Sequence, residues 1–159
     1  EVRFIQRSVE SLLRLQGQYL LFIVTNQSGI AKGLVGAEQV RRVNDHVVEY
    51  LSRQGVDIAA VYTCPHQRSD GCECIKPNVH FLERAVREHN VDLGGSFVVG
   101  DHPHDYELAE NGGCRGIYVL TGHGRKHFAE LPEAATVAED IEQACRMILE
   151  DEQIRGAGK

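Results

Sequence analysis

Short apolar runs alternate with amphipathic stretches along the whole chain. Residues 4–15 carry apolar side chains at helical spacing, and residues 19–25 form an almost continuous apolar run of strand length, as expected for a strand covered on both faces. Asn78 is the expected N-cap of a later helix. The same alternation predicts further helices at 37–54, 78–90, 105–111 and 139–150, and strands at 57–63, 96–100, 116–120 and near 136.

Strands that alternate with helices predict a Rossmann-like α/β fold, with a parallel sheet and helices on both faces. One domain is expected at 1–152, including a loop insertion at 64–77, and 153–159 are expected to be a flexible tail. In such sheets ligands bind beyond the carboxyl ends of the strands. The segments at Thr25, Lys76 and Asp101 are therefore expected to meet.

Composition narrows the classes of partner. The formal net charge of -6 does not favour binding to a nucleic acid, so no nucleic-acid partner is expected. There is no apolar run near the length of about 18 residues that a membrane span needs, so no membrane partner is expected. The chain has 5 cysteines, an odd number, and three of them lie close together. This pattern suits metal binding in a reducing compartment better than a disulfide framework, and it predicts a cytoplasmic protein.

The loop at 64–77 contains four potential metal ligands. They are Cys64, His66, Cys72 and Cys74. Residues two apart in an extended chain point the same way, so each pair can hold one ion from one side. Three thiolates and one imidazole make a closed tetrahedral shell for structural zinc, which is our prediction. Free cysteines in a mobile loop, or a disulfide between Cys64 and Cys72, are the alternatives.

Two polar segments suit a phosphate group. Thr25, with the backbone N–H groups of the turn-forming residues after it, could hold phosphate oxygens, although the same residues also make ordinary turns. Lys76 follows the last of the four metal ligands and is a well-placed positive charge for a phosphoryl group, although a lone lysine is usually only solvated.

Two carboxylates follow the apolar run that ends at Gly100. Asp101 stands where a predicted strand ends, which suits a hard cation such as Mg²⁺. Asp105 is either a supporting carboxylate for that cation or the cap of the next helix. The prediction is Mg²⁺ on Asp101.

The order and spacing of these motifs resemble the haloacid dehalogenase (HAD) superfamily, subfamily IIIA. Within it the chain is similar to the group of D-glycero-D-manno-heptose 1,7-bisphosphate 7-phosphatases and histidinol phosphatases. The resemblance implies a Mg²⁺-dependent phosphatase that hydrolyses a small phosphorylated metabolite, foremost that heptose bisphosphate, through an aspartyl-phosphate. Histidinol phosphate or another sugar phosphate is the alternative substrate, and a non-catalytic, zinc-stabilised phosphate-binding module is the alternative from another class.

The resemblance also implies roles for individual residues. Thr25 would hold the transferring phosphoryl group, Lys76 would neutralise its charge, and Asp101 would bind Mg²⁺. His102 stands where relatives often have a lysine that contacts substrate. The implied substrate contacts are Thr25, Asn26, Gln27, Ser28, Lys76 and His102, and the implied zinc ligands are the three cysteines and the histidine of the loop at 64–77.

The chain departs from the family pattern at two places. Ile75 stands where relatives usually have an arginine that recognises the substrate, which leaves the substrate open. Relatives attack with the first aspartate of an Asp-x-Asp motif, but the first aspartate here is Asp45, within a predicted helix. A leading strand with its loop is expected to be missing, so the chain by itself is expected to be inactive; a natural protein without a nucleophile is the alternative.

Overall fold

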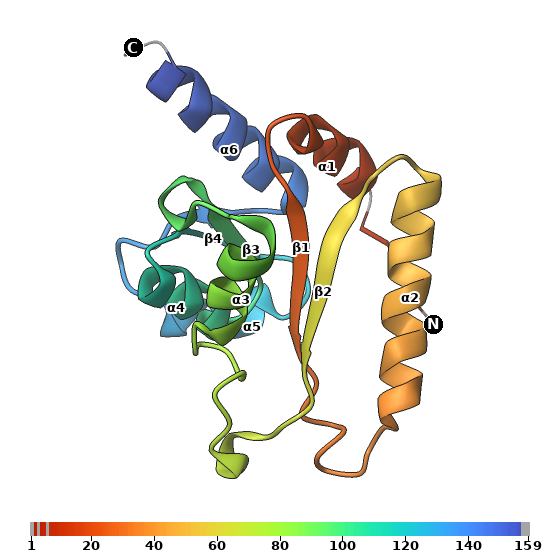
Figure 1. Cartoon of the computed structure of the whole chain (residues 1–159). Coiled ribbons are helices and arrows are strands. Elements are labelled where there is room, and N and C mark those ends of the chain that lie inside the picture. The colour runs from red at the N-terminus through yellow and green to blue at the C-terminus, as the bar shows by residue number, and fades with distance from the viewer. Residues whose placement is uncertain (1, 3, 6, 157–159) are drawn as a thin grey trace. The chain divides into compact units, whose positions relative to one another are not determined.

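The computed structural model describes residues 2, 4, 5 and 7–156 and divides into two compact units (Figure 1). One unit is Glu1–Ile75 and the other is Lys76–Lys159. Both units contain parallel strands joined through helices, so the predicted α/β class is confirmed. Among the described residues, no helix combines the length and the apolar character needed to cross a bilayer.

The first unit is built around two parallel strands. Its elements are α1 (Ser8–Gln16), β1 (Leu21–Asn26), α2 (Ala37–Arg53), β2 (Ile58–Cys64) and the 3₁₀ turn η1 (Arg68–Asp70). In the register of the pair, Thr25 lies opposite Thr63 and Asn26 lies opposite Cys64. The two loops that carry the predicted phosphate and metal ligands therefore leave the sheet side by side.

Helix α1 begins later than predicted. Arg7 has a φ of 63°, in the left-handed region, and this ends the regular helix on its N-terminal side. Residue 6 of the predicted first turn lies outside the described residues. At the other end, the Gln16 side chain donates to the Gly55 carbonyl oxygen at 2.9 Å and accepts from the Asp57 N–H at 2.6 Å, which ties α1 to the approach to β2.

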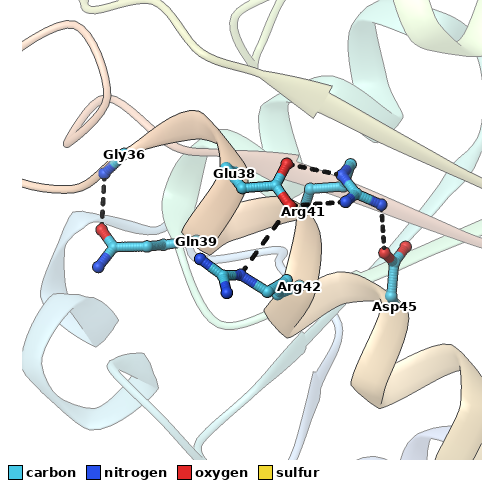
Figure 2. Close-up of polar contacts among 6 residues, drawn as sticks. All are labelled: Gly36, Glu38, Gln39, Arg41, Arg42 and Asp45. Atoms are coloured by element: carbon cyan, nitrogen blue, oxygen red, sulfur yellow. Dashed lines mark hydrogen bonds and ion pairs between the residues drawn. The ribbon is translucent and has the colours of Figure 1, made fainter.

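Helix α2 carries a row of charged side chains on its exposed face (Figure 2). The Gly36 N–H donates to Gln39 Oε1 at 2.8 Å and satisfies one free donor at the helix start. Arg41 pairs with Glu38 at 2.6 Å and with Asp45 at 2.9 Å. Asp45 thus lies within a helix, as predicted, and the structure adds that it is exposed and paired with Arg41.

Neither face of β1 is open to solvent, as expected for a strand covered on both faces, although none of its residues is fully buried. Every residue of β1 is half-buried, and β2 has only two fully buried residues, Tyr62 and Cys64. The sheet of this unit has two strands, so each of them is an edge. Side chains at an edge have neighbours on only one flank and keep part of their surface in solvent.

The second unit contains a sheet of three parallel strands in the order β3-β4-β5. Helices α4 and α6 both pack against it, with a core of Leu108, Ala109, Ile117, Tyr118, Ala144 and Ile148. The elements are α3 (His80–His89), η2 (Leu93–Gly95), β3 (Phe97–Gly100), α4 (Pro103–Gly112), β4 (Arg115–Val119), α5 (Gly124–His127), η3 (Phe128–Glu130), β5 (Val137–Ala138) and α6 (Ile141–Gly156).

In the second unit the predicted helix starts are displaced by two residues, including that of α6, which begins at Ile141 instead of 139. Helix α3 begins at His80 with Val79 as its N-cap, so Asn78 lies one position too early, in the bend after Pro77. Helix α4 begins at Pro103, two residues before the predicted start. Proline is favoured in the first turn because its missing N–H would have no helical partner there.

The last helix is longer than predicted. Helix α6 continues to Gly156, past the predicted end at 150 and into the predicted tail at 153–159; residues 157–159 lie outside the described residues. Asp151, one residue beyond the predicted end, pairs with Arg115 of β4, whose guanidinium lies 3.8 Å from the centre of the Phe97 ring. This ion pair links α6 to the sheet at a residue beyond the predicted end of the helix.

Candidate functional site

In the first unit, the loop after β1 lies against the start of the cysteine-containing loop. The Gln27 N–H donates to the Cys64 carbonyl oxygen at 2.7 Å, and the Ala31 N–H donates to the Pro65 carbonyl oxygen at 3.2 Å. Two of the predicted segments are thus held together by backbone hydrogen bonds. The parallel register of β1 and β2 places them there.

Thr25 lies at the carboxyl end of β1 with its hydroxyl already oriented. Gln27 Nε2 donates to Thr25 Oγ1 at 2.9 Å, so the hydroxyl hydrogen of Thr25 is left to donate elsewhere, as a phosphate oxygen would require. Asn26 is the last residue of β1, and Ser28 begins the turn after it, where its carbonyl oxygen accepts the Lys32 N–H at 3.1 Å.

The four predicted metal ligands converge on one point. Their donor atoms all lie within 4.8 Å of one another. The sulfur of Cys64 is 3.6 Å from that of Cys72 and 3.2 Å from that of Cys74, and the last two sulfurs are 3.7 Å apart. Ligands about 2.3 Å from a tetrahedral ion are separated by about 3.8 Å, so the set has the dimensions of a closed tetrahedral metal site.

The imidazole of His66 completes this Cys/His cluster. Its Nδ1 atom is 3.8 Å from the Cys64 sulfur and 3.4 Å from the Cys74 sulfur. The cysteines are all free, and sulfurs 3.2–3.7 Å apart are too distant for a disulfide bond of about 2.05 Å, so the alternative pairing of Cys64 with Cys72 is wrong. Burial raises the pKa of the Cys64 thiol to about 12 and also raises that of Cys74, so a bound cation would have to displace protons from both.

In the second unit, Lys76 is held in place by Asp105. The Lys76 ammonium is 2.7 Å from Asp105 Oδ1, and the two side chains are only 14% and 11% exposed. The alternative of a merely solvated lysine is therefore wrong. Asp105 Oδ2 accepts the His102 N–H at 3.1 Å, so Asp105 supports the start of α4 from the third helical position, while His102 and not Asp105 is the N-cap. Gly100 makes room for this carboxylate, because a Cβ at position 100 would collide with it.

Asp101 follows β3 directly and reaches a turn after β4. Its Oδ2 atom accepts the His123 backbone N–H at 2.7 Å. Among the described residues, none donates a hydrogen bond to Oδ1, and the side chain is 37% exposed. One oxygen thus remains open to a cation. This fits Mg²⁺, which takes one or two protein carboxylates and keeps several waters. The sequence pattern did not predict this turn, although Gly122 and Gly124 flank His123.

Three histidine rings lie together around His102, the residue that follows Asp101 in the sequence. The ring of His102 is stacked on that of His104, with centres 4.4 Å apart, and lies 4.8 Å from the ring of His127. His127 Nδ1 is 2.6 Å from Glu130 Oε1, and this hydrogen bond lowers the pKa of Glu130. Of these histidines only His102 was predicted as a site residue. The His-Pro-His pattern at 102–104 was the available signal for His104, and His127 had none.

Comparison with known proteins identifies the family. The HAD-hydrolase-like family model matches residues 73–144. The chain is 35% identical over 147 residues to the D-glycero-beta-D-manno-heptose-1,7-bisphosphate 7-phosphatase of Bordetella bronchiseptica, covering 91% of the chain and 82% of that relative. The chain belongs to the haloacid dehalogenase superfamily. Within the superfamily it is a phosphatase of the group to which this heptose bisphosphate enzyme belongs.

Other HAD proteins agree in sequence and in structure. The crystal structure of the D,D-heptose 1,7-bisphosphate phosphatase of B. bronchiseptica, complexed with magnesium and phosphate, matches with a TM-score of 0.83 and 34% identity. The match covers 92% of this chain and 84% of that one. The histidine biosynthesis bifunctional protein HisB of Actinobacillus pleuropneumoniae is 32% identical over 118 residues, covering 74% of this chain and 32% of that protein.

The HAD motifs are distributed over both units. The first unit brings the segment after Thr25 beside the Cys/His cluster, and the second places Lys76 against Asp105 and Asp101 against the turn after β4. The expected meeting of Thr25 with Lys76 and Asp101 joins residues of different units and stays a prediction.

Proposed function

We propose that the chain provides the phosphate-binding and metal-binding residues of a Mg²⁺-dependent phosphatase for D-glycero-D-manno-heptose 1,7-bisphosphate. The observation that carries the proposal is the ion pair of Lys76 with Asp105, both nearly buried, at the carboxyl end of the β3-β4-β5 sheet. A lysine that is kept ordered and largely out of solvent is suited to bind a phosphoryl group. The B. bronchiseptica relative and the B. bronchiseptica crystal structure named above are heptose bisphosphate phosphatases by name, which supports this substrate.

In this proposal each residue has a separate task. Thr25 donates its hydroxyl hydrogen to a phosphoryl oxygen, and Lys76 places positive charge where negative charge develops during phosphoryl transfer. Asn26, Gln27, Ser28 and His102 contact the rest of the substrate. Asp101 would hold Mg²⁺, which would supply positive charge to the phosphoryl oxygens. Asp105 orients Lys76, and its support of the cation remains a prediction.

The Cys/His cluster would hold structural zinc. Three thiolates and an imidazole are a frequent zinc set, and a shell with four protein ligands leaves no position for substrate. The bound ion would fix the loop that precedes Lys76. Thiols that must stay reduced to bind zinc also favour a reducing compartment, and we place the protein in the cytoplasm.

Histidinol phosphate is the second candidate substrate. Ile75 lies beside Lys76 in the sequence and carries no charge, where an arginine would offer a fork of donors to the substrate. The match to HisB is the reason to keep this alternative, although the heptose bisphosphate relatives are more similar to the chain. A substrate comparison distinguishes the two.

The test separates phosphate binding from turnover. The proposed reaction needs an aspartate nucleophile, and the 159 residues contain no Asp-x-Asp pair. We expect the 159-residue chain, loaded with zinc and Mg²⁺, to bind orthophosphate in a calorimetric titration but to release none from heptose bisphosphate. When joined to a strand and loop that carry Asp-x-Asp, it is expected to gain turnover by a factor on the order of a million.

The matched control is the same joined chain with Asn-x-Asn, which should bind but not turn over. Faster turnover of histidinol phosphate than of heptose bisphosphate would assign the second substrate. Binding without turnover in the Asp-x-Asp chain would support the non-catalytic phosphate-binding module. Phosphate release by the 159 residues alone would contradict the proposed nucleophile.

A further inference from the structure

The turn after β4 makes a close contact with Asp101. The His123 backbone N–H donates to Asp101 Oδ2 at 2.7 Å, across 22 positions of sequence. The His123 ring contributes less, because its Nδ1 atom is 3.7 Å away and its side chain is 74% exposed. The backbone of the turn, and not the imidazole, is therefore the group that fixes the carboxylate.

Gly122 allows this contact for two separate reasons. Its φ is +60°, a backbone conformation that residues other than glycine rarely adopt. In addition, a Cβ at this position would collide with Asp101 Oδ2. Any side chain at position 122 would thus displace either the turn or the carboxylate.

The turn is held from the sheet side. The Tyr118 hydroxyl, buried in β4, donates to the Gly124 carbonyl oxygen at 2.9 Å, and the Gly124 N–H donates to the Thr121 carbonyl oxygen at 2.9 Å. Burial raises the pKa of Tyr118, which keeps its hydroxyl protonated as a donor. A Cβ on Gly124 would strike the Val119 carbonyl oxygen, so the turn lies tightly against the end of β4.

We propose that the Gly122–His123 peptide is the positioning element of the Mg²⁺ site: it binds Asp101 Oδ2 and turns Oδ1 toward the cation. This inference rests on the proposed function, in which Asp101 binds Mg²⁺. Hydrogen bonds to the second oxygen of a ligating carboxylate orient it, and their loss typically weakens metal binding about 10- to 100-fold. Position 122 is accordingly a site at which the chain tolerates only glycine without loss of the cation.

The test compares two glycines that share a left-handed backbone. Gly113 has a φ of +70° but nothing within 4 Å of its Cβ position, so Gly113→Ala introduces the same kind of backbone strain without touching Asp101. Mg²⁺ alone is titrated into the zinc-loaded 159-residue chain by calorimetry. We expect Gly122→Ala to weaken Mg²⁺ binding about 10- to 100-fold, and Gly113→Ala to leave it within about twofold.

Two variants at His123 complete the design. His123→Pro removes the donating N–H and leaves Gly122 unchanged, so it should weaken Mg²⁺ binding like Gly122→Ala, including where the latter does not fold. His123→Ala keeps the backbone N–H and should retain the Mg²⁺ affinity of the wild-type chain. A large loss of Mg²⁺ affinity in His123→Ala would show that the imidazole positions Asp101, and it would overturn the proposal. Equal Mg²⁺ affinity of wild type, Gly122→Ala and His123→Pro would overturn it as well. Absence of Mg²⁺ binding by the wild-type chain would overturn the proposed metal site itself, and with it this inference.

Discussion

Cys74→Ala is expected to abolish the binding of one zinc ion and to make the loop between β2 and Lys76 mobile. The variant loses one of four donors that lie within 4.8 Å of one another. Structural zinc contributes on the order of 10–16 kcal/mol to small domains, and few apolar residues in this loop could replace that contribution. Zinc content measured by mass spectrometry should fall from one ion per chain to almost none, and hydrogen exchange in the loop should become fast.

Cys114→Ala is the matched control for this variant. Cys114 is also a half-buried free cysteine but lies outside the Cys/His cluster, so its replacement should leave the zinc content at one per chain. Binding of zinc releases protons from thiols whose pKa is raised, so the affinity of the wild-type chain should fall as the pH is lowered. Stoichiometric zinc in Cys74→Ala would show that the four residues are not one metal site.

Lys76→Met is expected to remove most of the phosphate affinity and, in the chain joined to Asp-x-Asp, to lower kcat about 10²- to 10³-fold. Methionine retains much of the length of the side chain but not its charge. In the variant, the Asp105 side chain, which is only 11% exposed, loses the ammonium group of Lys76 as its partner. The unpaired carboxylate then repels the phosphate that the lysine would have attracted. Calorimetry with orthophosphate measures the first effect, and phosphate release measures the second.

Two further variants show whether position and charge both matter. Lys126→Met removes an exposed lysine of α5 and should leave phosphate binding and kcat unchanged. Asp105→Asn keeps the size of the side chain but removes its ion pair with Lys76. It should lower kcat more than it raises KM, because the ammonium of Lys76 is still present but is no longer positioned by a carboxylate. Unchanged kcat in Lys76→Met would remove the lysine from the proposed site.

The local pattern predicted most of the helices and strands because each has its own apolar period. The errors lie at element ends. Val79 instead of Asn78 occupies the N-cap position of α3, α4 begins early at Pro103, and α6 extends past Glu150, where Asp151 pairs with Arg115 of β4. A periodic pattern of apolar residues contains neither the choice of residue at a helix start nor a contact with a distant residue such as Arg115.

The sequence by itself determined the Cys/His cluster and the order of the HAD motifs. A chelating loop is local, so the spacing of its four donors is enough to predict that they meet, and the structure confirms this. Only the tertiary structure decided that Lys76 pairs with Asp105 and that the turn at Gly122 holds Asp101. These contacts depend on how parallel strands align and on where their carboxyl ends lie, and that alignment is set by packing across the sheet rather than by the residues next to each group.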